Sequence, residues 1–191
     1  MPARGTTTLP IGLGLEGSWI ALEPPGEANA EALDELDRKA RLHPAMGGGI
    51  RSGPAAFAPE MLIRERRGGG IVGVVLNHRM PADIAAYFIY LDPDVGRAGY
   101  GIEATALYVS HLFDSGARLV TADVLSFNRA VIGILGKAGI KPQATLREHA
   151  YAAGRFWDVL VFSFGVEEWL AALARYRSRL PGGDRRPVAF G

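Results

Sequence analysis

Several features that mark particular classes of protein are missing from this sequence. The 191 residues include no cysteine, which excludes disulfide bonds, thiolate metal ligands and a cysteine nucleophile. The net charge is +1, so the charge balance gives no sign of a general affinity for nucleic acid or membranes. The longest unbroken apolar run, residues 84–91, is far too short to cross a bilayer. We therefore expect a cytoplasmic protein without a membrane span.

Motifs for metal and hydrolase chemistry are missing as well. The four histidines do not have the spacing of metal ligands, and no zinc motif is present. The sequence contains no G-x-S-x-G elbow, which a serine hydrolase of the α/β type would need. The N-terminal residues make a poor signal peptide because they lack a long apolar core. We expect no metal site.

Length and composition indicate one globular domain. Apolar residues make up 48% of the chain, and 191 residues are enough for one sizeable core but marginal for two. Both ends are rich in Gly and Pro, which is typical of loose segments. We expect a flexible N-terminal segment at 1–17, a single domain at 18–180 and a flexible tail at 181–191.

The hydrophobic pattern predicts alternating strands and helices. Period-two alternation and apolar runs predict strands, whereas apolar positions three and four residues apart predict helices. The predicted strands are 18–23, two within the hairpin 61–79, 83–92, 118–125, 140–147 and 155–164. The predicted helices are 27–42, 101–116, 129–139 and 166–180. Strand, helix and strand at the centre form one parallel crossover, so we expect a mixed α/β sheet of about seven strands, mostly antiparallel, with helices on both faces.

A glycine-rich loop, "VGRAGYG" at residues 95–101, precedes the helix at 101–116. A helix N-terminus exposes unpaired N–H groups and the positive end of the helix dipole. Glycines let such N–H groups approach a phosphate closely. The loop therefore predicts a site for a phosphate-bearing cofactor.

A dinucleotide-binding fold is one interpretation of this loop. "GYGIEA" at 99–104 matches G-x-G-x-x-A, and Asp123 follows at about the expected distance. The seven residues "DPDVGRA", however, separate the preceding strand from the glycines, and the chain continues with a hairpin instead of further βα units.

The second interpretation rests on a resemblance. The loop resembles the (Q/R)-x-x-G-x-(G/A) motif of the GNAT superfamily of N-acetyltransferases, and the chain is similar to the branch that includes the ribosomal-protein N-terminal acetyltransferases. Further matches are "LDP" at 91–93, "EA" at 103–104, Asn128, "GKAGI" at 136–140, "GRFWD" at 154–158 and "EEW" at 167–169. The resemblance extends from about residue 18 to residue 170, and the order of these motifs favours it over the dinucleotide interpretation.

The resemblance implies acetyl-CoA as co-substrate. Backbone amides of the loop would hold its pyrophosphate, a backbone N–H near Tyr90 or Leu91 would bind the thioester carbonyl, and Asn128 would bond the pantetheine arm. The implied cofactor-binding residues are Leu91, Gly96, Arg97, Ala98, Gly99, Tyr100, Gly101 and Asn128. The chain departs from the pattern at three places: Gly96 replaces Gln or Arg, Val131 a common serine, and Ala86 a common glutamate.

The catalytic and acceptor-binding residues stay open between several candidates. Tyr87 and Tyr90, on the predicted cofactor strand, are candidates for donating to the leaving thiolate, although their pattern favours core aromatics whose hydroxyls find a partner. His149 and Tyr151 lie at a late strand turn where the branch often places the acceptor. His43 and Arg51, in the glycine-rich stretch after the first helix, are further candidates for contacting the acceptor. For Asp158, which lies in the "GRFWD" match, we favour a structural role in a strand pair.

Three classes of function remain from the sequence. The first is an acetyltransferase that acts on a protein N-terminus or peptide, and the second is the same direct transfer to a small amine. The third is a non-catalytic acyl-CoA-binding module with the same fold, to which the losses at Ala86 and Val131 give weight. A homodimer is plausible from the edge strands and the last helix.

Overall fold

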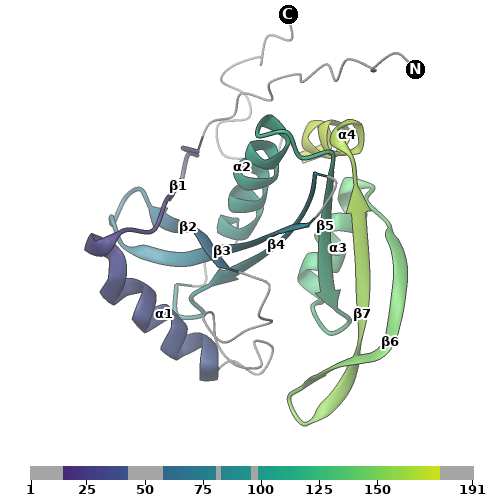
Figure 1. Ribbon diagram of the computed structural model, residues 1–191, viewed down its shortest axis with the longest axis horizontal. Coiled ribbons are helices and arrows are strands. Elements are labelled where there is room, and N and C mark those ends of the chain that lie inside the picture. Colours follow the sequence, from purple (N-terminus) through teal and green to yellow (C-terminus); the bar gives the residue numbers. More distant parts are fainter. Residues whose placement is uncertain (1–14, 43–57, 81–82, 96–98, 177–191) are drawn as a thin grey trace, which may run out of the picture.

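The computed structural model describes residues 15–42, 58–80, 83–95 and 99–176. It contains seven strands and four α-helices in this part of the chain (Figure 1). The strands are β1 (Ile20–Glu23), β2 (Ala58–Glu65), β3 (Ile71–Met80), β4 (Ile84–Leu91), β5 (Leu119–Leu125), β6 (Pro142–Ala152) and β7 (Arg155–Phe164). The helices are α1 (Ala30–Leu42), after a short 3₁₀ turn at Glu27–Asn29, α2 (Tyr100–Asp114), α3 (Arg129–Ala138) and α4 (Val166–Tyr176).

All seven strands belong to one sheet, in the order β1-β2-β3-β4-β5-β7-β6. β4 and β5 are parallel, and every other neighbouring pair is antiparallel. The parallel pair is joined through α2, as a parallel connection requires. The predicted mixed sheet with one central parallel crossover is therefore confirmed.

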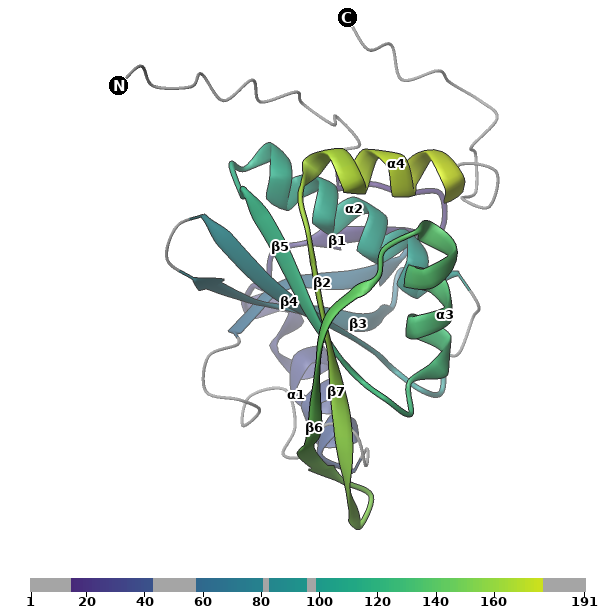
Figure 2. The ribbon, with the colours of Figure 1, turned by 90° about the vertical axis from the view of Figure 1, so that its right-hand side faces the viewer.

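Helices cover both faces of the sheet, as predicted. α1 packs on one face against Leu62, Val74, Leu76 and Tyr90. α2, α3 and α4 pack on the other face, where the larger hydrophobic core lies. Figures 1 and 2 show that the β6–β7 hairpin extends beyond this packed region as a long arm. No helix in the described part of the chain is long and apolar enough to span a membrane.

The last hairpin differs from the sequence prediction. We expected β6 to end near Arg147 and a loop to follow, but the strand continues to Ala152. A β-bulge between Leu146 and Ala150 accommodates the extra residues of β6 relative to β7, and Glu148 within it has a φ of 47°. The turn is then reduced to Ala153 and Gly154, both with positive φ, the geometry that suits a two-residue hairpin turn.

Candidate active site

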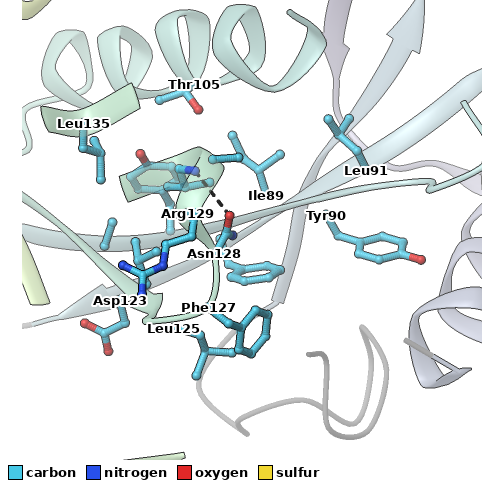
Figure 3. A pocket seen from close by; sticks show the side chains of 16 residues that line it. Ile89, Tyr90, Leu91, Thr105, Asp123, Leu125, Phe127, Asn128, Arg129 and Leu135 are labelled. Carbon is cyan, nitrogen blue, oxygen red and sulfur yellow. Dashed lines mark hydrogen bonds between the residues drawn. The ribbon is translucent and has the colours of Figure 1, made fainter. Parts of the chain in front are cut away.

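A cavity of about 560 Å³ lies where β4 and β5 separate. The two strands pair only from Ile84 to Ala86 and from Leu119 to Thr121. Beyond these pairs the strands form the walls of the cavity, and the start of α3 and Thr105 of α2 complete it (Figure 3). Its lining consists of Tyr87, Phe88, Ile89, Tyr90, Leu91, Thr105, Ala122, Asp123, Val124, Leu125, Phe127, Asn128, Arg129, Ala130, Val131 and Leu135.

The backbone of β4 presents hydrogen-bonding groups to this cavity. The N–H of Asp92 donates to the carbonyl of Val72 at 2.9 Å, and the register places Tyr90 opposite Val74. In an antiparallel pair the peptide groups alternate in direction, so Tyr90 directs its N–H and C=O toward β3. Ile89 and Leu91 direct theirs toward the side of β5, beyond the last β4–β5 pair. The donor that we expected near Tyr90 or Leu91 therefore fits Leu91 or Ile89.

The N-terminus of α2 lies next to the end of β4, where Leu91 lines the cavity. Gly99 is its N-cap, with a left-handed φ of 115°, and a Cβ on Gly99 would collide with the ring of Trp19. At Gly101 an added Cβ would lie 3.4 Å from Leu91 Cδ1, so the first turn of α2 touches the end of β4. Thr105, one turn further along α2, lines the cavity.

Buried polar contacts fix this helix start to β1 and β2. Glu103 is buried, and its carboxylate accepts N–H bonds from Ser18, Trp19 and Ile20 at 2.6–3.0 Å. The hydroxyl of Tyr100 bonds the carboxylate of Glu65. Glu103 lies in the first turn of α2, where a carboxylate also complements the helix dipole, but its hydrogen bonds are with the backbone at the start of β1. Both residues hold α2 in place and do not line the cavity.

An ion-pair cluster holds the chain between β4 and the glycine loop. The ammonium of Lys39 on α1 lies 2.6 Å from Asp92 Oδ2 and 2.8 Å from Asp94 Oδ2. Asp92 Oδ1 also accepts the N–H of Asp94 at 2.9 Å. These hydrogen bonds raise the pKa of Lys39, so its ammonium keeps its charge at neutral pH. The "LDP" segment thus leads from β4 into the loop in a fixed direction.

The two tyrosines of β4 lie on opposite faces of the sheet. Tyr87 lies on the α2 face, with its ring centroid 6.0 Å from that of Tyr108. Tyr90 packs into the α1 cluster instead. Burial raises the pKa of Tyr87, which a hydrogen bond with Thr105 opposes. Burial and the carboxylate of Asp92 raise the pKa of Tyr90. Both hydroxyls keep their protons near neutral pH, so either can donate and neither is a base.

Asn128 has a structural role at the start of α3. It is the N-cap residue, and its Oδ1 accepts the N–H of Val131 at 3.3 Å (Figure 3), as N-cap asparagines commonly do. Asn128 and Val131 both line the cavity. Asn128, whose side chain we expect to bind the pantetheine arm, therefore lies at the cavity, and its hydrogen bond to the first turn of α3 orients it.

Asp123 is a candidate residue that sequence reasoning missed for this site. It lines the cavity from β5. Although the residue is exposed to solvent, the cavity wall partly desolvates its carboxyl and raises the pKa of that group, while the positive charge of His149 opposes the rise. We had considered Asp123 only as the acidic residue of a dinucleotide site. The sequence feature that could have identified Asp123 is a single carboxylate within the otherwise apolar strand "LVTADVL". His149, predicted from the late turn, is exposed and does not line the cavity, but its charge acts on this carboxyl.

Other predicted site residues lie elsewhere. Tyr151 is 63% exposed, pairs with Phe156 at 5.1 Å between ring centroids and does not line the cavity. Asp158 accepts the N–H of Glu148 at 2.9 Å and so supports the β6 bulge, the structural role that we favoured. Five further predicted residues lie outside the described part of the chain: Gly96, Arg97, Ala98, His43 and Arg51.

Comparison with known proteins gives matches among solved structures alone. No family model matches the chain, and no curated protein sequence matches it. RimJ from Mycobacterium smegmatis, solved in complex with CoA-disulfide, superposes with a TM-score of 0.64 at 18% identity, covering 84% of this chain and 88% of RimJ.

Two further solved structures have the same fold. The ribosomal-protein-S5-alanine acetyltransferase from Vibrio fischeri superposes with a TM-score of 0.63 at 12% identity, covering 81% of this chain and 97% of that one. The spermidine/spermine N-acetyltransferase SpeG from Vibrio cholerae gives 0.64 at 14% identity, with coverages of 80% and 96%. The chain therefore has the fold of the GNAT acetyltransferases, the fold that its motifs predict.

Proposed function

We propose that the protein is an acetyl-CoA-dependent N-acetyltransferase that transfers acetyl directly to a primary amine while both substrates are bound. The observation that carries this proposal is the cavity between β4 and β5, into which Ile89 and Leu91 direct peptide groups that lie beyond the last β4–β5 pair of the described sheet. An open strand edge inside a protein favours a ligand that supplies hydrogen-bonding partners along an extended chain. The pantetheine arm of CoA carries two amides and fits this requirement.

The proposed position of CoA follows from the two ends of the cavity. The first turn of α2, at Gly99 and Tyr100, offers N–H groups and the positive end of a helix dipole to the pyrophosphate. The arm then extends along β4, with Asn128 on its other side. The thioester carbonyl would accept from the N–H of Leu91 or Ile89. RimJ, which has the same fold, was solved with a CoA derivative.

The proposed reaction is a single transfer. The bound ammonium first loses one proton to a base, because only the neutral amine has a lone pair. The amine nitrogen then attacks the thioester carbonyl carbon, the C–N bond forms as the C–S bond breaks, the nitrogen loses a second proton and the sulfur gains one. A preorganised backbone N–H stabilises the oxygen as it becomes negative. Tyr87, on the α2 face with Thr105, donates a hydrogen bond toward the leaving sulfur, whereas Tyr90 stays packed against α1. His149, whose charge acts on the carboxyl of Asp123, is the proposed acceptor of the first proton from the ammonium.

The two remaining alternatives differ in what the cavity does. A binding module would hold acetyl-CoA without transferring the acetyl group. This alternative is supported by Val131 and Ala86, which stand where the acetyltransferase pattern commonly has a serine and a glutamate. A dinucleotide-binding protein would hold NAD instead. The acceptor also belongs to one of two candidate classes, a protein or a small amine. Solved structures with the same fold include a ribosomal-protein-S5-alanine acetyltransferase and a spermidine/spermine N-acetyltransferase.

Release of the free CoA thiol separates catalysis from binding. The protein is incubated with acetyl-CoA and a panel of primary amines and N-terminally free peptides, and the thiol is titrated with a chromogenic disulfide. An acetyltransferase releases thiol faster with one class of amine than without amine, and mass spectrometry finds the acetylated product. Acetyl-CoA binding with no amine-dependent release would identify a binding module and refute the enzymatic proposal.

A further inference from the structure

We propose that Asp123 binds the ammonium group of the acceptor, and that the acceptor is a primary amine carried on an apolar or aromatic group. This inference rests on the proposed acetyltransferase function and specifies its substrate. The amine of the acceptor has to lie beside the thioester, and we place it on the side of the cavity away from α2.

The position of Asp123 supports this role. The side chains of β5 alternate, with Val120, Ala122 and Val124 buried and Asp123 exposed on the opposite face. Ala86 of β4 pairs with Thr121, two residues before Asp123, so Phe88 and Asp123 continue the same face on the two diverging strands. Asp123 therefore lies at the rim of the cavity on the face opposite α2.

The charges around the cavity leave this carboxylate available. The charged residues among the described cavity lining are one carboxylate, Asp123, and one guanidinium, Arg129. No ion pair joins these two side chains, so Arg129 does not neutralise Asp123 directly. Asp92 and Asp94, at the end of β4, are both held by Lys39. By contrast, no described residue forms a hydrogen bond or an ion pair with Asp123; only the charge of His149 acts on it. A cationic ligand would supply the missing partner, because an ionised carboxylate gains most from a charged donor.

The walls beside Asp123 determine what carries the amine. Phe88 is 37% exposed at the cavity, and Leu125 and Phe127 line it from the β5 side. Phe127 is held by an edge-on contact with Trp157, at 4.8 Å between ring centroids. A carboxylate beside apolar and aromatic surface matches an ammonium separated by a short spacer from an apolar or aromatic group. Both a small aralkylamine and a peptide with an apolar N-terminal residue have this chemistry.

The test compares amines and removes the charge of Asp123. The full-length protein is assayed for acetyl-CoA thiol release with phenethylamine, with ethanolamine as the amine that lacks the ring, and with a tetrapeptide that begins with phenylalanine. We expect kcat/KM to be at least about tenfold higher for phenethylamine or the peptide than for ethanolamine. A preference between these two then identifies a small or a peptidic source.

Asp123→Asn is expected to raise KM for the preferred amine about 10- to 100-fold, because hydrogen bonds to charged groups contribute that much to binding. Calorimetry should find the affinity of this variant for acetyl-CoA unchanged, which also demonstrates that it folds. Glu167→Gln, which removes one exposed carboxylate at the start of α4, serves as the charge-matched control and should keep the wild-type KM.

Two results would overturn the inference while leaving the acetyltransferase proposal intact. One is a wild-type protein that releases thiol fastest with ethanolamine or with another amine that lacks an apolar group. The other is an unchanged KM in Asp123→Asn. Failure of the wild-type protein to bind acetyl-CoA would instead refute the proposed function, so the two failures are distinguishable.

Discussion

Gly99 links the backbone conformation at the start of α2 to the packing of β1. Its φ of 115° is unfavourable for any residue with a Cβ, and that Cβ would also collide with Trp19. We predict that Gly99→Ala lowers the free energy of unfolding by about 2–5 kcal/mol, the sum of backbone strain and overpacking. Chemical denaturation measures the loss.

Gly69 provides the matched control for this variant. Its φ is also positive, at 71°, but a Cβ there would meet no atom within 4 Å. Gly69→Ala should therefore lower stability by backbone strain alone, about 1–2 kcal/mol. Equal losses in the two variants would contradict the role given to Trp19.

Tyr87 makes the stability of the protein sensitive to alkaline pH. Because burial raises the pKa of its hydroxyl in the folded state, its contribution is complete below the ordinary tyrosine pKa of about 10 and is lost as the pH rises above it. We predict that the free energy of unfolding decreases more steeply between pH 10 and pH 11 in the wild type than in Tyr87→Phe, by up to about 1.4 kcal/mol.

Urea denaturation at pH 8, 10 and 11 gives the slopes for this comparison. Tyr151→Phe, at an exposed site, should keep the wild-type slope. The same alkaline slope in the wild type and Tyr87→Phe would mean that the Tyr87 hydroxyl is not buried as described.

At the scale of single elements, α3 contains two glycines at positions where the helix conformation does not require glycine. Gly133 and Gly136 are exposed within the helix, and a Cβ at either would meet no atom within 4 Å. We predict that Gly133→Ala and Gly136→Ala each raise the free energy of unfolding by about 0.5–1 kcal/mol, measured by thermal and chemical denaturation.

Gly139, at the end of the same helix, should respond in the opposite direction. It has a φ of 82° as the C-cap, and a Cβ there would overlap the guanidinium of Arg175, which bonds the carbonyl of Ala138 at 2.6 Å. A stabilising Gly139→Ala, or destabilising changes at Gly133 and Gly136, would contradict this description of α3.

The elements themselves follow closely from the sequence, and the reasons are local. Strong periodicity and clear end signals, such as Gly139 after α3, fixed most boundaries to within two or three residues. The prediction was wrong for the end of β6, where a bulge and a turn with two positive φ values let the polar segment 148–152 remain in the strand. Bulges depend on the neighbouring strand, here on Asp158, and a sequence pattern does not contain that contact.

For the candidate site, the sequence pattern points to residues on the cofactor side more readily than to residues on the acceptor side. The glycine loop and Asn128 are adjacent to helix starts, so their spacing along the chain indicates their role. The roles of Tyr87 and Tyr90 depend on the face of β4 to which each belongs, and that face is set by packing against α1 and α2. The charge of His149 acts on Asp123 because β5, β7 and β6 pair in one sheet, and this pairing brings distant segments of the chain into the same region.

At the scale of the whole molecule, the sheet consists of two halves that meet along one short parallel pair. β1–β4 pack against α1 and the start of α2, while β5–β7 carry α3 and α4 on the same face as α2 (Figures 1 and 2). The cavity lies where the halves separate. The central claim is that this separation holds acetyl-CoA, and a variant that fills the cavity tests the claim without changing the packed core.

Ala130 lies exposed on the first turn of α3 and lines the cavity, so Ala130→Trp places a large ring there. Lys137→Trp puts the same ring on the same helix at an exposed position outside the lining. The measurement is an isothermal titration of acetyl-CoA into the wild type and both variants, with NAD as the control ligand. We predict saturable binding of acetyl-CoA and none of NAD, an affinity at least about tenfold weaker in Ala130→Trp, and wild-type affinity in Lys137→Trp. Equal acetyl-CoA affinity in all three proteins, or binding of NAD in place of acetyl-CoA, would contradict the account.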